Sequence, residues 1–311
     1  MSAAYENPLI PNARLRQIYL AMLRARLLEK TLPAARRGHA VANGSAGHAV
    51  GMAGLEACLV STSVDLGPQD LVSDALAGGV VDFLRGAALG TVLRPGKLTP
   101  KRAPAEPDAD CGAAAALPAA AGTAERLWAA MGAAAALQAA AAVAKIIAKA
   151  DGGTAKPAGV AVVYLRSGEA PAALLRKVFT FAAERELPAI FVLLPPPRMR
   201  GGAAAKAGGA SALALRSGVP GIAVDADDAV AIYRVAQESI GRARARGGAA
   251  LIECIPFLLS GAAGQRKPAE DAADPIAGLE HYMLQRGVAT RAWIEQAARS
   301  FARRLETAAS R

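Results

Sequence analysis

Two uninterrupted apolar runs mark the middle of the chain, "VAVVYL" at 160–165 and "AIFVLL" at 189–194. Neither run alternates with polar residues, which is typical of strands that are covered on both faces of a parallel sheet. Between the runs, apolar residues recur at helical spacing: Leu174, Leu175, Val178, Phe179 and Ala182. Pro171 suits the first turn of such a helix. We therefore predict a strand–helix–strand unit whose strands are parallel neighbours.

The same alternation continues toward the C-terminus. Apolar runs at 221–225 and 249–256 predict two further strands. The helix between them is expected to begin at Asp227 or Asp228, because an aspartate can accept hydrogen bonds from the first free N–H groups of a helix. Alternating strands and helices of this kind predict an α/β fold, with a parallel sheet and helices on both faces.

The ends of the chain are predicted to be helical. An amphipathic pattern begins near residue 12, and we expect one helix at 12–37 and a C-terminal helical tail at 274–311. A chain of 311 residues is long enough for one large α/β domain, so 1–311 is interpreted as a single domain.

Two segments have unusual compositions. Residues 94–123 contain five prolines and many alanines, which predicts a long loop. The helix expected at 124–150 is apolar and close to the length that spans a membrane. It is nearly all alanine and carries Gln138 and Lys145, so we interpret it as a tightly packed core helix and predict no membrane association.

Composition narrows the classes of partner. The formal net charge is +10 and the sequence pI is about 9.9, but the basic residues are spread along the chain, as on a solvated surface. Aromatic residues make up only 4%, so nucleic-acid binding through base stacking is not expected. Three cysteines without CxxC spacing favour neither a disulfide framework nor a zinc site. With no signal peptide recognised, we expect a cytoplasmic protein.

The candidate chemistry lies directly after the first run, at Arg166, Ser167, Gly168 and Glu169. Ligands of open α/β sheets bind where a strand ends and a helix begins, and the free N–H groups of the helix favour an anion there. Arg166 could supply a positive charge to such an anion. The alternative is an arginine at the sheet edge that forms a salt bridge with Glu169 or another neighbour.

Several segments resemble the alpha subunit of the decarboxylating component of 2-oxo-acid dehydrogenase complexes. They occur in the order and spacing of that family: "GLEA" at 54–57, "DLV" at 70–72, Arg85–Gly86, "ELPAIFV" at 186–192, "GIAVDADD" with the residues that follow it to "LLSG" at 221–261, and "DPIAGLEHYMLQRG" at 274–287. The resemblance implies a thiamine-diphosphate-binding fold, thiamine diphosphate with magnesium as cofactors, and a beta subunit as partner.

The same register implies that the cofactor site has been lost. The "GDG" of the family's diphosphate motif falls on 166–168, which puts Ser167 where the family has its metal-binding aspartate. The "NN" that closes the motif falls on 195–196, which is Pro-Pro. "YRDHG" falls on 76–80 and "GHS" on 261–263, so the arginine and both histidines are missing. Magnesium normally takes oxygen ligands that include a carboxylate, so we do not expect it here.

Four functions remain open. The chain resembles a catalytically degenerate alpha subunit that would act as a scaffold with a beta-like subunit or with itself. It could instead be an active thiamine-diphosphate enzyme with an atypical site, or an anion-binding module at Arg166. Nonspecific nucleic-acid binding through net charge is the fourth. The resemblance also implies an oligomer, and any binding of thiamine diphosphate is expected to be weak.

Overall fold

A computed structural model describes residues 10–33, 39–40, 52–74, 76–93, 114–118, 122–154, 157–195, 209–255 and 274–310. Within these residues, six strands form one parallel sheet in the order β4-β2-β5-β6-β8-β7. The strands are β2 (Leu71–Ser73), β4 (Ala115–Ala116), β5 (Ala161–Arg166), β6 (Ala189–Leu194), β7 (Gly221–Asp225) and β8 (Ala250–Ile255). A separate antiparallel pair joins β1 (His39–Ala40) to β3 (Leu76–Ala77).

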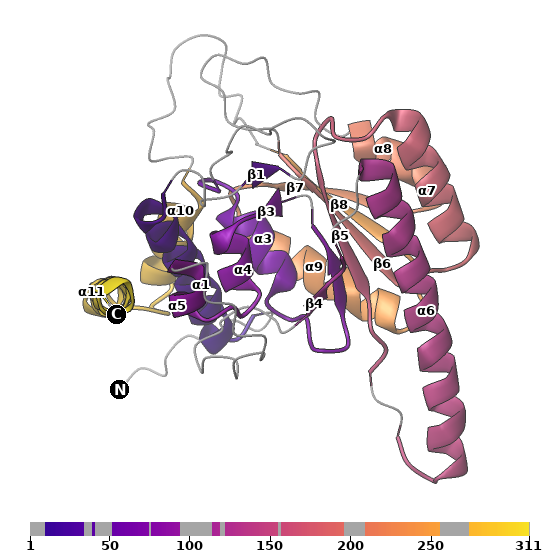
Figure 1. Ribbon diagram of the computed structural model, residues 1–311, viewed down its shortest axis with the longest axis horizontal. Coiled ribbons are helices and arrows are strands. Elements are labelled where there is room, and N and C mark those ends of the chain that lie inside the picture. The colour runs from indigo at the N-terminus through magenta and orange to yellow at the C-terminus, as the bar shows by residue number, and fades with distance from the viewer. Residues whose placement is uncertain are drawn as a thin grey trace.

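Helices cover both faces of the sheet (Figure 1). On one side lie α6 (Thr123–Ala150), α7 (Ala172–Glu184) and α8 (Gly209–Arg216). On the other side lie α1 (Asn12–Thr31), α3 (Glu56–Ser63), α4 (Gly79–Leu84), α5 (Leu89–Leu93), α9 (Ala229–Arg244), α10 (Pro275–Gln285) and α11 (Arg291–Ser310). The predicted α/β fold with a parallel sheet covered on both faces is confirmed.

The central strands are buried on both faces, as their unbroken apolar sequences predict. In β5, Val162 and Tyr164 belong to the core shared with α1, α3 and α9, whereas Val163 and Leu165 face the core beneath α6 and α7. β5 pairs with β6 along its whole length, from Ala161 opposite Ala189 to Arg166 opposite Leu194. The predicted parallel neighbours are therefore confirmed, and their carboxyl ends lie together at one edge.

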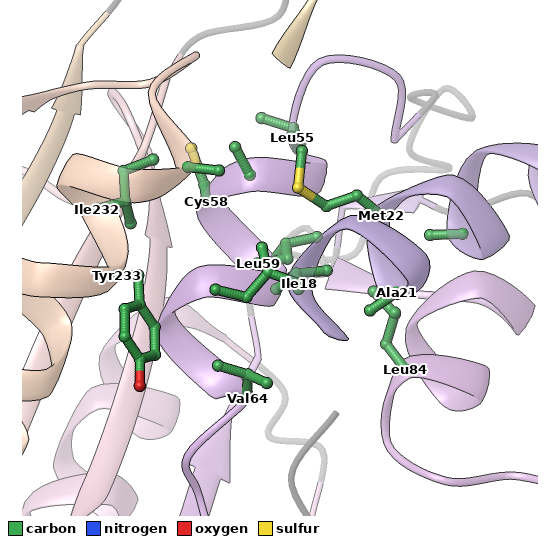
Figure 2. Packing of buried hydrophobic residues seen from close by; sticks show 14 of the residues in the cluster. Ile18, Ala21, Met22, Leu55, Cys58, Leu59, Val64, Leu84, Ile232 and Tyr233 are labelled. Atoms are coloured by element: carbon green, nitrogen blue, oxygen red, sulfur yellow. The ribbon is translucent and has the colours of Figure 1, made fainter. Parts of the chain in front are cut away.

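The first of these cores joins segments that are far apart in the chain. Figure 2 shows Ile18 and Met22 of α1 close to Leu59 of α3, with Ile232 and Tyr233 of α9 on the other side of α3. All five side chains are at least nine-tenths buried. The N-terminal and C-terminal helices thus belong to the same packed body as the sheet.

Two residues of the family-like segments hold this body together. Glu56 is 1% exposed and accepts hydrogen bonds from Arg26 and from the backbone N–H of Gly54, the latter at 2.7 Å. Arg26 also donates to both oxygens of Asp274, at 3.2 and 3.1 Å. These contacts join α1, α3 and α10, so this acidic motif residue has a structural role.

The first helix is shorter than predicted. We expected 12–37, but α1 ends at Thr31, and Leu32 already has an extended backbone (φ −74°, ψ 142°). Leu32 precedes Pro33, and the proline ring clashes with a preceding residue that remains helical. Residues 34–38 lie outside the described part of the chain.

The alanine-rich helix lies where it is predicted, but its predicted burial is confirmed only for its first half. Leu127 and Met131 are fully buried, whereas Val143, Ile146 and Ile147 are 55%, 70% and 55% exposed. The 28 residues of α6 extend about 42 Å, and a six-residue strand only about 20 Å, so the sheet cannot cover the whole helix. Figure 1 shows the last turns of α6 extending beyond the sheet.

By length and composition, α6 is also the one described helix that could cross a membrane. Only 17% of its most apolar stretch is buried. A single such helix is a weak indication, because long helices of water-soluble proteins pass the same criterion.

The segment predicted as a loop at 94–123 differs in its second half. Ala115 and Ala116 form β4, which pairs with β2 at the edge of the sheet, and Thr123 is already part of α6. Residues 94–113 and 119–121 lie outside the described part of the chain.

Candidate functional site

The turn after β5 is held in place at the edge of the sheet. The backbone N–H of Ser167 donates to the carbonyl of Leu194 at 3.1 Å, and that of Glu169 donates to the carbonyl of Arg166 at 3.0 Å. Gly168 has φ +80°, in the left-handed region where only glycine is unstrained. The four candidate residues thus form one tight turn between β5 and α7.

Glu169 is fully engaged within the protein. Its Oε2 accepts a hydrogen bond from the backbone N–H of Arg166 at 2.8 Å. Its Oε1 accepts from Thr123 at 3.1 Å and from the guanidinium of Arg126, both in the first turn of α6. Arg126, which is 5% exposed, also donates to the carbonyl of Tyr164 at 2.7 Å. The ion-pair partner of Glu169 is therefore Arg126. The alternative expected Arg166 to pair with Glu169 or another neighbour, and among the described residues no ion pair joins Arg166 to Glu169.

Arg166 is buried without such a partner. Only 8% of the residue is exposed, and among the described residues nothing accepts a hydrogen bond from its Nη2 atom. Burial lowers the pKa of the guanidinium, and the nearby charge of Glu169 opposes this shift. A buried donor without a partner is uncommon in folded proteins and calls for an explanation.

Arg166 lines a pocket of about 160 Å³ at the carboxyl ends of β5, β6 and β8. We call it the Arg166 pocket; its lining residues are Leu165, Arg166, Ser167, Gly168, Ala170, Leu175, Leu193, Gly209, Ala210 and Glu253. The wall is polar and apolar in nearly equal parts, and it includes one guanidinium and one carboxylate.

That carboxylate, Glu253, was not predicted as a site residue. It lies on β8, is 5% exposed and accepts hydrogen bonds from the start of α8. The donors are the backbone N–H groups of Ala210 at 3.3 Å and Ser211 at 2.8 Å, and the Ser211 hydroxyl at 2.5 Å. The positive end of the helix dipole also favours a carboxylate at this position. The charge of Glu253 is thus compensated by α8.

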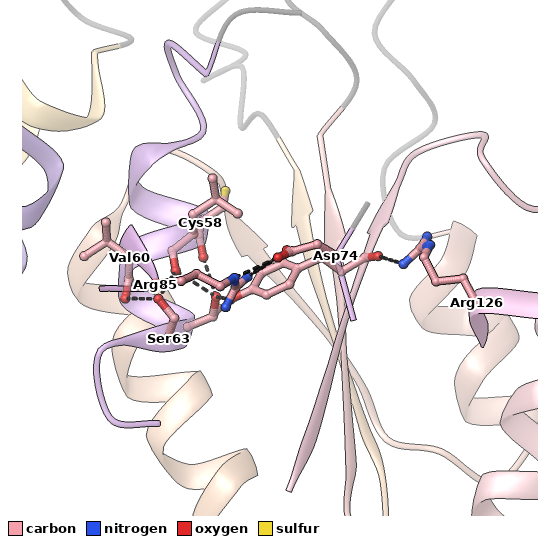
Figure 3. A network of polar contacts seen from close by, with 9 residues as sticks. Cys58, Val60, Ser63, Asp74, Arg85 and Arg126 are labelled. Carbon is pink, nitrogen blue, oxygen red and sulfur yellow. Dashed lines mark hydrogen bonds and ion pairs between the residues drawn. The ribbon is translucent and has the colours of Figure 1, made fainter. Parts of the chain in front are cut away.

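A second polar cluster lies at the end of β2, the strand beside β5. Asp74 accepts two hydrogen bonds from Arg85, each at 2.7 Å. Burial raises the pKa of Asp74, while Arg85 and Arg126 oppose this shift. Figure 3 shows Arg85 and Arg126 pointing toward the edge of the sheet from opposite sides. Asp74 is not among the residues that the sequence predicts for the site, although its position directly after a strand is a usable signal.

Some predicted positions cannot be placed. Pro195 follows β6 within the described residues, but 196 and 261–263 lie outside them. Leu76 and Ala77 form β3, and Gly78 precedes α4. Within the described part of the chain, no group of three or more His, Cys, Asp or Glu residues could hold a metal ion.

The residue types of this turn do not fit a magnesium-bound diphosphate. Magnesium requires oxygen ligands in near-octahedral geometry, usually with one or two carboxylates. The turn offers the Ser167 hydroxyl beside the positive charge of Arg166, and its one carboxylate, Glu169, is held by Arg126. Chemically, the site offers a small anion one buried donor without a hydrogen-bond partner among the described residues, Nη2 of Arg166.

Comparisons with known proteins agree with the fold. A family model described as "Dehydrogenase E1 component" matches residues 30–311. The alpha subunit of acetoin:2,6-dichlorophenolindophenol oxidoreductase from Bacillus subtilis (strain 168) is 35% identical over 77 residues, which cover 22% of this chain and 23% of that protein. The chloroplastic pyruvate dehydrogenase E1 component subunit alpha-3 of Oryza sativa subsp. japonica is 35% identical over 82 residues, 24% of this chain and 19% of the relative. The matches thus span less than a quarter of the length of either relative.

Proposed function

Since the chain belongs to the dehydrogenase E1 component family and is similar to its alpha subunits, we propose that it is a catalytically degenerate alpha-type subunit. Its role would be that of a scaffold in a 2-oxo-acid dehydrogenase assembly. The family depends on thiamine diphosphate. The proposal is that this member keeps the fold of the family without its cofactor chemistry.

One observation carries the proposal: a buried arginine and a serine occupy the turn after β5. Thiamine diphosphate brings several negative charges, which must be neutralised when the diphosphate leaves water. In the family the resemblance implies a metal for this task, with an aspartate at the position of Ser167. Here Arg166 and the N-terminus of α7 remain, together worth about 4 kcal/mol at most. By the usual conversion that is an affinity in the millimolar range.

The retained contacts of the fold support the same conclusion. Glu56, which belongs to a family-like motif, is committed to Arg26 and keeps α1, α3 and α10 together. Asp70, in another such motif, is completely buried and accepts hydrogen bonds from Gly67 and Val160 at 2.7 and 2.9 Å. Motif residues that hold the fold have been kept, while those implied for the cofactor have been replaced.

A scaffold needs a partner, and we propose a beta-like subunit or a second copy of the chain. The exposed aliphatic side chains Val143, Ile146 and Ile147 gather on the last turns of α6. Exposed apolar patches of this kind are typical of protein–protein contacts. Light scattering of the purified chain at micromolar concentration should therefore give the mass of an oligomer, and a stable monomer would contradict self-association.

The decisive experiment is calorimetric titration of the full chain with thiamine diphosphate and magnesium. We expect no signal at micromolar concentrations and, at most, weak binding that is unchanged when magnesium is chelated. A chain of the same family that has the aspartate of the "GDG" motif serves as the positive control. Micromolar binding that depends on magnesium would contradict the proposal and favour an active enzyme with an atypical site.

A further inference from the structure

The Arg166 pocket contains one positive charge that the described residues leave without a hydrogen-bonding partner at Nη2. Both carboxylates close to it are already occupied. Glu169 is paired with Arg126, and Glu253 accepts three hydrogen bonds from the start of α8. An arginine that is 8% exposed loses most of its hydrogen bonds to water. A ligand with acceptor atoms would replace those hydrogen bonds.

From this geometry we propose that the Arg166 pocket binds a small organic monocarboxylate, with the carboxylate on the guanidinium of Arg166. The two oxygens of a carboxylate match the planar fork of N–H groups that a guanidinium presents. The start of α7 adds a favourable dipole, because Ala170 lines the pocket and α7 begins at Ala172.

The residues that line the pocket limit the size and polarity of the ligand beyond its carboxylate. Leu165, Leu175 and Leu193 supply apolar surface, and a volume of about 160 Å³ admits a short aliphatic chain. An anion with several charges is disfavoured, because the pocket offers a single guanidinium, that of Arg166, to balance them. The proposal of a monocarboxylate ligand does not depend on whether the subunit is catalytically degenerate.

The test uses butyrate as the probe and the full chain as the protein. Butyramide has the same shape without the charge, and inorganic phosphate tests the preference for a carboxylate. At constant ionic strength, butyrate should raise the Tm in a concentration-dependent manner and bind with a Kd in the millimolar range by calorimetry. Butyramide should bind at least tenfold more weakly, and phosphate more weakly than butyrate.

The variants assign this binding to one side chain. Arg166→Met should weaken butyrate binding at least tenfold and raise the Tm of the ligand-free protein, because it removes a buried guanidinium whose Nη2 atom has no hydrogen-bond partner among the described residues. Arg166→Lys keeps the charge without the fork and should give intermediate affinity. Arg176→Gln, which removes an exposed arginine from α7, is the matched control and should bind butyrate as the wild type does.

Equal binding of butyrate and butyramide, stronger binding of phosphate, or unchanged butyrate binding in Arg166→Met would each overturn the proposal. If Arg166→Met does not fold, the comparison of butyrate with butyramide and the Arg166→Lys variant still decide. The thiamine diphosphate titration addresses the proposed function separately. If neither butyrate nor thiamine diphosphate binds, the proposed monocarboxylate pocket is refuted, whereas the proposal of a degenerate subunit still stands.

Discussion

Arg126 is ion-paired with Glu169 across a separation of 43 residues, while Arg166, three residues before Glu169, contributes only its backbone N–H to that carboxylate. The pairing links the first turn of α6 to the turn between β5 and α7. It also commits the Oε1 atom of Glu169 to Arg126, while Nη2 of Arg166 has no hydrogen-bond partner among the described residues. The charge of the Arg166 pocket therefore depends on a residue that does not line it.

Breaking this ion pair should destabilise the protein strongly. Arg126→Met leaves Glu169 without its ion-pair partner in a position where its side chain is 12% exposed, and loss of one member of a buried pair costs about 3 kcal/mol or more. Urea unfolding measures this loss. Glu125→Gln, at the neighbouring exposed position, is the control and should change the free energy of unfolding by less than about 0.5 kcal/mol. Similar effects of the two substitutions would show that the pair contributes little.

The two halves of α6 should respond differently to substitution. Met131 is fully buried, so Met131→Ala should cost about 2–4 kcal/mol in urea unfolding. Ile146 is 70% exposed, and Ile146→Gln should instead lower the mass found by light scattering. Leu215→Gln is the matched control, because Leu215 is 68% exposed on α8 and should not affect assembly. If Ile146→Gln retains the wild-type mass, the contact surface lies elsewhere.

The contact between Arg26 and Asp274 should make stability depend on pH. Burial of Asp274 disfavours its charge, but hydrogen bonds from Arg26 and from the backbone N–H of Ile276 outweigh this and lower its pKa. The contribution is therefore complete above the unfolded pKa of about 3.9 and is lost as the pH falls through the lower folded value.

Urea unfolding between about pH 5 and pH 3 measures this contribution. The wild type should lose more stability over that window than Asp274→Asn, whose side chain does not titrate. Between pH 6 and 7 the difference between the two proteins should be constant, which is the internal control. Parallel curves over the acidic window would rule out a contribution from Asp274.

The two described cysteines should be unreactive in the folded protein. Cys58 and Cys254 are 0% and 2% exposed, and a hydrogen bond with Cys254, together with burial, raises the pKa of the Cys58 thiol. In a Cys111→Ser background, a chromogenic disulfide reagent at pH 8 should label them on the order of 100-fold more slowly in buffer than in urea. Labelling that is rapid without denaturant would mean that this part of the core opens readily.

Much of the fold was predictable because it depends on local patterns. The apolar run at 189–194 coincides with β6, and the run at 160–165 is displaced from β5 by one residue. Asp228 caps α9 as expected, since it accepts hydrogen bonds from the N–H groups of Val230 and Ala231. Periodicity, strand composition and caps act over a few residues, so a single sequence contains them.

The site was predictable only in part. The sequence by itself determined that Arg166, Ser167, Gly168 and Glu169 form the turn at the carboxyl end of a strand, because strand, turn and helix follow one another in the chain. It also determined that this turn lacks the aspartate implied by the family. The sequence contained no signal that Arg126 would form an ion pair with Glu169. It also contained no signal that Glu253, on another strand, would line the Arg166 pocket.

Only the tertiary structure decided these pairings and the burial of α6. Charged side chains choose partners by distance in the folded protein, and residues such as Asp70 and Arg244 meet although 174 positions separate them. An alanine-rich helix has nearly the same composition whether it is packed or exposed, because alanine brings little apolar area. Which half of α6 is covered therefore depends on where the sheet ends. Arg126 pairs with Glu169 because the first turn of α6 lies beside the turn after β5, and Nη2 of Arg166 is left without a hydrogen-bond partner among the described residues.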